Sequence, residues 1–144
     1  MGKKRIIKKA GASADQGLKE RSASKIPKRK IVSGILNIQS TYNNTILTIS
    51  DEKGNTVMWG SSGSLGFKGT KKSTPFAASK VAELLCEKAK NIGLKSVHVI
   101  LRGVGSGRES AIRTFISKGI EVLSIQDKTP VPHNGPKPKK PRRV

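Results

Sequence analysis

The sequence is poor in cysteine, in aromatic residues and in acids, and it has no long apolar run. Its 144 residues include one cysteine, Cys86, which excludes an intramolecular disulfide and suits a reducing compartment. Cys86 falls in an apolar helical stretch, where we expect a small buried hydrophobe. No segment approaches the roughly 18–20 apolar residues of a membrane span, and none of signal-peptide length follows the basic start. An organellar transit peptide at that start stays open as an alternative.

The shortage of acids argues against catalysis. Six acids lie within residues 31–125, namely Asp51, Glu52, Glu83, Glu87, Glu109 and Glu121. Two of them belong to a predicted turn, and Glu83 and Glu87 have the spacing of an exposed helical pair. No Ser–His–Asp or Cys–His arrangement is apparent, and the two histidines and one cysteine lack zinc-binding spacing. We therefore expect no enzymatic activity, no metal and no cofactor.

Positive charge is what the sequence has in excess, with a net charge of +20. Residues 1–30 carry 11 Lys or Arg against 2 acids, residues 31–125 carry 12 against 6, and residues 126–144 carry 6 against 1. Two strongly basic ends thus flank a moderately basic middle. These ends lack the apolar face of an interfacial helix, so we expect a nucleic-acid partner and no membrane.

Both basic ends are predicted to lie outside the folded core. Residues 1–30 are low in apolar content and predict a disordered basic arm. Residues 129–144 are rich in proline, which removes backbone donors and favours an extended, solvated tail. The basic residues expected to meet phosphates in this tail are Lys137, Lys139, Lys140, Arg142 and Arg143. His133, beside Asn134, is expected to contact RNA rather than a metal. Between these two ends, residues 31–128 are predicted to form a single folded domain.

Periodicity predicts a βββαβαβ order, which gives an α/β domain with a mixed five-stranded sheet and two main helices. Strands are expected at 31–40, 45–50, 56–60, 96–102 and 120–126, and helices from 74 to 93 and 108 to 118. The last two crossovers should be right-handed and should give parallel strands. In the first strand Val32, Leu36 and Ile38 are expected on one face. The nearly continuous apolar strand 96–102 predicts cover on both faces, with His98 buried or half-buried.

Two glycine-rich loops, 60–72 and 103–107, each precede a predicted helix start. Glycine allows backbone N–H groups to approach an anion, and a helix start adds free donors and partial positive charge. The cations placed there are Lys68, Lys71, Lys72 and Arg108. The helix dipole disfavours a cation in the first turn, so Arg108 suggests an external anion. The alternative is a plain connector with solubilising charge, and neither loop matches a P-loop or a dinucleotide fingerprint.

Asn43, Asn44 and Thr45 form a predicted turn between the first two strands. This segment has two readings: a simple hairpin turn, or exposed amides that contact phosphate, ribose or base edges.

Five segments resemble the S-eleven family of small-subunit ribosomal proteins, of bacterial or organellar type. They are YNNTI at 42–46, GSLGFKG at 63–69, KSTPFAA at 72–78, GRESAIR at 107–113 and TPVPHNG at 129–135. The resemblance covers about residues 31–144, in order and with the family spacing. Two departures stand out: the family usually has proline where Val104 and Ser106 stand, and often Cys-Arg where Pro136 and Lys137 stand.

The resemblance implies a ribonuclease-H-like fold without nuclease activity, bound to small-subunit rRNA on the platform near the mRNA exit side. It also implies neighbouring platform proteins and proximity to mRNA as partners. Within the matching motifs, Ser64, Phe67, Arg113 and Asn134 join the residues expected to bind RNA. The implied location is the ribosome of a bacterial cytoplasm, with an organellar matrix or stroma as the alternative. Two other functions are kept open: a ribonuclease-H-like nuclease and a basic DNA-binding protein.

Overall fold

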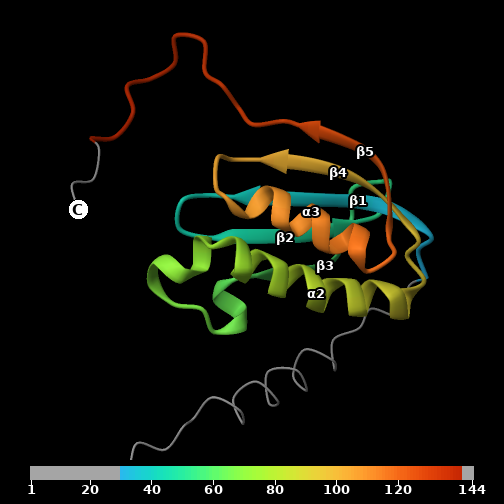
Figure 1. Ribbon diagram of the computed structural model, residues 1–144. Helices are drawn as coiled ribbons and strands as arrows, with labels where there is room; N and C mark the ends of the chain where they lie inside the picture. The colour runs from blue at the N-terminus through green and yellow to red at the C-terminus, as the bar shows by residue number, and fades with distance from the viewer. Residues whose placement is uncertain (1–29, 141–144) are drawn as a thin grey trace, which may run out of the picture.

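Five strands form one mixed sheet in the computed structural model, which describes residues 30–140 (Figure 1). The strands are β1 (Ser33–Ser40), β2 (Thr45–Ser50), β3 (Thr56–Ser61), β4 (Ser96–Arg102) and β5 (Glu121–Asp127). Their order across the sheet is β3-β2-β1-β4-β5. The first three pair antiparallel, whereas β4 runs parallel to β1 and β5 parallel to β4. The predicted βββαβαβ order and mixed sheet are confirmed. Apart from residue 30, the predicted arm lies outside the described residues.

Local sequence signals account for the bounds of the long helix α2 (Pro75–Ile92). The Thr74 hydroxyl accepts a hydrogen bond from the Ala77 N–H at 3.3 Å, and proline occupies the first helical position. At the other end Gly93 has φ of +94° and donates its N–H to the carbonyls of Ala89 and Lys90. The predicted start and stop of this helix are confirmed.

The remaining helical segments are α3 (Gly107–Ser117) and two short 3₁₀ turns, η1 (Gly63–Leu65) and η2 (Gly69–Ser73). The bounds of α3 lie one residue before those predicted. The first 3₁₀ turn lies within the glycine-rich segment 60–72, which the sequence predicted only as a loop, and the second extends one residue beyond it to Ser73.

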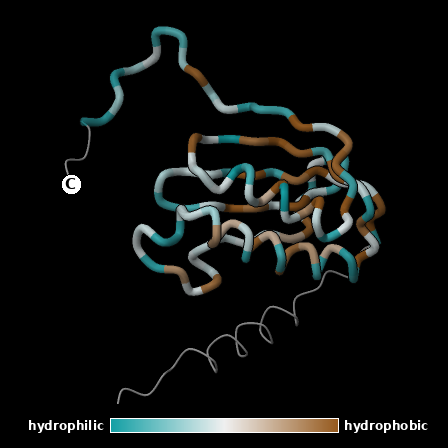
Figure 2. The backbone as a smooth tube through the Cα atoms, viewed as in Figure 1, coloured by the Kyte–Doolittle hydropathy of each residue, from teal (hydrophilic) through white to brown (hydrophobic). Residues whose placement is uncertain are grey.

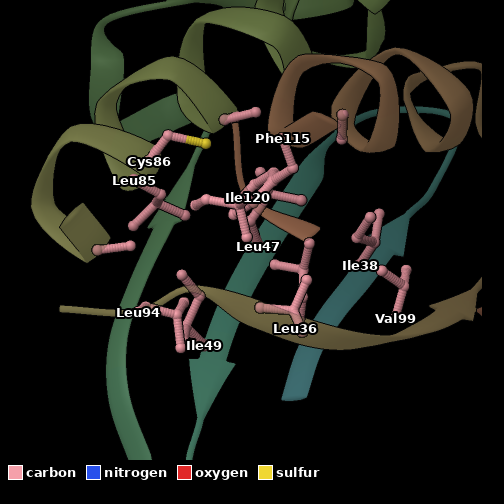
Figure 3. Close-up of a cluster of buried hydrophobic side chains, with 14 of the residues drawn as sticks. Leu36, Ile38, Leu47, Ile49, Leu85, Cys86, Leu94, Val99, Phe115 and Ile120 are labelled. Atoms are coloured by element: carbon pink, nitrogen blue, oxygen red, sulfur yellow. The ribbon is translucent and has the colours of Figure 1, made fainter. Parts of the chain in front are cut away.

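The hydrophobic core lies between the sheet and the two helices (Figure 3). Phe115 of α3 is fully buried and belongs to the same cluster as Leu47 of β2 and Ile120. Cys86 of α2 is also fully buried, and burial raises the pKa of its thiol to about 12. The expectation of a small buried hydrophobe at Cys86 is confirmed. In Figure 2 the hydrophobic stretches of the chain gather in these layers, while residues 128–140 are mostly hydrophilic.

Both helices cover the same face of the sheet, and within residues 30–140 no helix covers the opposite face, which we call the open face (Figure 1). The reason is topological: β3, β4 and β5 run in one direction, and the two crossovers advance the same way across the sheet. Two right-handed crossovers that advance the same way place their helices on one side.

This arrangement corrects three predictions. Burial along β4 alternates, so the strand is covered on one face only, despite its apolar sequence. His98 points to the open face, is exposed, and shares a hydrogen bond of 2.7 Å with the Ser124 hydroxyl. Val32 precedes β1 and is 64% exposed, whereas Leu36 and Ile38 are buried as expected.

Candidate nucleic-acid interface

Three segments that lie far apart in the sequence meet at one edge of the sheet, which we call the helix-start edge. They are the β1–β2 turn (41–44), the basic loop with its two 3₁₀ turns (61–74) and the glycine-rich loop 103–107. The edge also holds the C-terminal ends of β1, β4 and β5 and the N-termini of α2 and α3 (Figure 1). Open α/β sheets bind their ligands at this kind of edge.

Hydrogen bonds join the two loops to each other and to the strand ends that flank the turn. The Ser106 hydroxyl donates to the Ser73 carbonyl at 3.0 Å and so links the two glycine-rich loops. The Gly105 N–H donates to the Ser40 carbonyl at 3.0 Å, and the Ser62 N–H donates to the Thr45 carbonyl at 3.0 Å. The sequence indicated two loops, each with its own helix start, and the structure shows that they form a single surface.

The glycines of the loop 103–107 serve close packing. A Cβ on Gly105 would lie 2.5 Å from the Thr41 carbonyl oxygen, and Gly103 has φ of +96°, a conformation that side chains disfavour. Two of the loop's N–H groups are already used, since Gly103 donates to the Thr129 hydroxyl and Gly105 to Ser40. The prediction that these glycines free the backbone for an anion is therefore corrected for Gly103 and Gly105.

The tip of the β1–β2 turn is exposed to solvent, whereas its base, at Thr45, is buried. The Thr41 hydroxyl accepts hydrogen bonds from the N–H groups of Asn43 and Asn44, at 3.4 and 3.1 Å, which shapes the tip. Tyr42 is 76% exposed and Asn43 is exposed, while Asn44 is half-buried. Thr45 is fully buried, and its hydroxyl is hydrogen-bonded to that of Ser40 at 3.3 Å. Among the predicted turn residues, Thr45 thus supports the tip and is absent from its surface.

The basic loop places cations at the same edge of the sheet as this turn. Lys68 and Lys71 are exposed and Lys72 is half-buried. Hydrogen bonds within the loop stabilise its backbone, because the Ser73 hydroxyl donates to the Thr70 carbonyl and the Thr74 hydroxyl donates to the Lys71 carbonyl. No acid occurs among residues 61–74. The loop therefore offers a positive surface with a defined backbone.

Two other residues predicted in this loop have intramolecular contacts. The Ser64 hydroxyl donates to the Ser61 carbonyl at 2.6 Å. The Phe67 ring meets the Phe76 ring edge to face, with 6.2 Å between centroids. Phe76 was missed by the sequence analysis, yet it is 63% exposed and has the Lys80 ammonium 5.6 Å from its ring centroid. The signal that could have found it is an aromatic residue at the helix start, outside the buried helical stripe.

Arg108 has an internal partner, which overturns the argument that it requires an external anion. Its guanidinium donates to the Gly103 carbonyl at 2.9 Å and forms an ion pair with the Asp127 carboxylate. Hydrogen bonds from the Thr129 hydroxyl and N–H, followed by the one from Arg108, lower the pKa of Asp127 to about 2. Asp127 thus supplies the anion that offsets the helix dipole. Arg113, also predicted to bind RNA, is exposed and pairs with Glu109.

The C-terminal tail leaves the domain from this ion pair. The Lys128 N–H donates to the Leu101 carbonyl at 2.9 Å, and Thr129 closes the last contact with the loop 103–107. All residues from 130 to 140 are exposed, and the segment runs away from the domain (Figure 1). The exposed predicted residues there are His133, Asn134, Lys137, Lys139 and Lys140. Arg142 and Arg143 lie outside the described residues.

A family model described as Ribosomal protein S11 matches residues 34–143, which include the whole helix-start edge and all of the tail except residue 144. The chain belongs to the ribosomal protein S11 family. It is 53% identical over 126 residues to the small ribosomal subunit protein uS11 of Solibacter usitatus (strain Ellin6076). The matched residues make up 88% of this chain and 93% of that protein. The predicted family is confirmed.

The described part of this S11-family chain has an exposed edge with lysines and no acidic cluster. Within residues 30–140, no group of three or more His, Cys, Asp or Glu side chains could hold a metal ion. Within the same residues, no helix has the length and apolar character needed to cross a membrane. The exposed amide of Asn43, the lysines and the aromatic ring on this edge are of the kinds that can contact phosphate, ribose and bases.

Proposed function

We propose that this chain is a structural protein of the small ribosomal subunit that binds rRNA on the platform, near the mRNA exit side. The observation that carries the proposal is the convergence of the Asn43 turn with the lysines of the basic loop on one edge, in a chain of the S11 family. Neighbouring platform proteins are the proposed protein partners, with mRNA nearby. The proposed location is the ribosome of a bacterial cytoplasm.

The mechanism we propose is static clamping of folded RNA. The sheet and helices hold the helix-start edge in one shape, so little ordering is needed there on binding. The tail neutralises phosphates along a separate path, and the arm over 1–30 is proposed to do the same. Because both extensions are strongly basic, their contribution should depend on salt through counterion release.

The test is binding of a small-subunit rRNA fragment at several salt concentrations. The double variant Lys71→Gln with Lys72→Gln should reduce the slope of log K against log salt by roughly 1.4–1.8, if each lysine neutralises one phosphate. The matched control is Lys90→Gln with Lys95→Gln, which removes the same charge from exposed positions remote from the edge. Equal slopes for the two double variants would contradict the proposed edge.

The same assay separates the two alternatives. A nuclease would cleave the fragment in a reaction that depends on a divalent metal. A DNA-binding protein would bind duplex DNA of equal length at least as tightly as the rRNA fragment. Either result would replace the proposed function.

A further inference from the structure

The open face of the sheet carries a hollow that the proposed function does not use. The hollow has a volume of about 170 Å³ and lies on the side opposite the helices. Besides the buried Ile38, it is lined by Asn37, Gln39, Ile46, Thr48, Ile100 and Arg102. This volume is below the roughly 300–1,000 Å³ of ordinary small-molecule sites, so a single flat group fits better than a free metabolite.

The register of the sheet gives the hollow its chemistry. Two rows of side chains cross the open face, one through Gln39, with Ile46 and Arg102 as neighbours, and one through Asn37, with Thr48 and Ile100 as neighbours. Isoleucines therefore alternate with amide, hydroxyl and guanidinium groups. Amide side chains offer a donor and an acceptor together, which is the pattern that pairs with base edges, and a guanidinium suits phosphate.

Trp59 lies next to Thr48, one of the residues that line this hollow. It pairs with Thr48 across β2 and β3, shares its face of the sheet, and is 62% exposed. A large exposed aromatic ring on a sheet, beside amides, is the arrangement on which RNA-binding sheets stack unpaired bases. Trp59 is also the single tryptophan of the chain, so its fluorescence reports on this site alone.

Charge and position favour RNA over a protein partner. The hollow is lined by one cation and no carboxylate, in a chain of net charge +20. Gln39 and Arg102 immediately precede Ser40 and Gly103 of the helix-start edge, so one strand of RNA can pass from that edge onto the open face. The core of a protein interface is usually more apolar and holds fewer unpaired amides.

We propose that the open face binds one unpaired nucleotide of RNA, with its base stacked on Trp59 and its polar edge or phosphate held by the hollow. This inference rests on the proposed function to the extent that both require RNA. It adds a second contact face, and it restricts the ligand there to an unstacked base, because a paired base in a duplex cannot enter the hollow.

The experiment titrates the full chain with a single-stranded 12-nucleotide oligo(A) RNA and with a 12-base-pair RNA duplex. The emission of Trp59 should be quenched saturably by the single strand and much less by the duplex. Binding of the labelled single strand, measured by fluorescence anisotropy, should weaken about tenfold in Arg102→Gln and about five- to 100-fold in Trp59→Ala. Trp59→Phe should keep most of the affinity. The control Lys90→Gln, on an exposed part of α2, should change affinity less than about twofold.

Three results would overturn the inference. The single strand could bind by anisotropy without any change in Trp59 emission, which would leave the proposed function standing. The duplex could quench as strongly as the single strand. Finally, Trp59→Ala and Arg102→Gln could bind RNA normally but fail to join reconstituted small subunits, which would identify the face as a protein-docking surface. Failure of the rRNA fragment to bind would instead remove the proposed function. Both variants change exposed side chains, and their unfolding temperatures should match that of the parent.

Discussion

Replacing Gly107 by alanine should strain the helix-start edge at a tightly packed point. Gly107 is the first residue of α3 and is buried. A Cβ there would lie 2.5 Å from the Thr45 hydroxyl oxygen and 2.9 Å from the Ala78 Cβ. Both distances are below van der Waals contact, and both neighbours belong to packed elements, so the loop or the strand must move.

The magnitude follows from two opposing contributions. Overpacking a buried site by one methyl group costs about 1–3 kcal/mol. Alanine has a higher helix propensity than glycine, which stabilises the fold by up to about 1 kcal/mol, and by less than that at a first helical position. We therefore expect a net loss of about 1–2 kcal/mol in the free energy of unfolding, which lowers the unfolding temperature by at least about 4 °C.

The assay is thermal or denaturant unfolding of Gly107→Ala beside the control Gly63→Ala, where the nearest atom would lie 3.6 Å away. A double-mutant cycle with Thr45→Ala removes the closest oxygen, so Gly107→Ala should cost less in that background, with a coupling of about 0.5–3 kcal/mol. The reasoning would be refuted if Gly107→Ala and Gly63→Ala unfolded at the same temperature. It would also fail if the cycle showed no coupling.

Three further predictions concern the ends of the chain and the ion pair. Removing residues 137–144 deletes five basic residues and should lower the salt slope of rRNA binding by roughly 3–5 units, with the unfolding temperature unchanged; equal slopes would mean that this charge is only solvated. Limited proteolysis of the RNA-free chain should leave a core near residues 31–128, and intact ends would contradict the predicted arm and tail. Because the pKa of Asp127 is lowered from 3.8 to about 2, its hydrogen bonds from Thr129 and its ion pair with Arg108 should together stabilise the fold above about pH 4. That stability should disappear as pH falls towards 2, so the difference in unfolding temperature between the parent and Asp127→Asn should shrink over this range.

Much of the fold could be predicted from the sequence because its signals are local. Thr74 and Pro75 start a helix by satisfying or removing free N–H groups, and Gly93 ends it by adopting positive φ. Alternating apolar residues set β2 to its observed bounds, 45–50. The family motifs and the excess of positive charge could likewise be read without any structure, and the family match confirmed the first of these.

The candidate interface was predicted in its parts but not in its assembly. Lysines, an asparagine turn and two helix starts were indicated separately, yet a hydrogen bond between Ser106 and Ser73 is a contact over 33 residues that no local pattern carries. The prediction for Arg108 was wrong for the same reason. Its position in the first turn of α3 was correctly expected. Its partner Asp127, however, lies at the end of strand β5, outside the local sequence pattern around Arg108.

The sequence by itself determined which segments form strands and helices, where the charge lies and which family the chain resembles, because these depend on neighbouring residues and on composition. Only the tertiary structure decided that both helices cover one face, that Thr45 lies beneath the turn, and that Trp59 and Arg102 share an open face with a hollow. The physical reason is that strand order and crossover direction arise from packing the whole sheet. Because the whole sheet packs in this way, His98 is exposed in a strand whose sequence predicted burial on both faces.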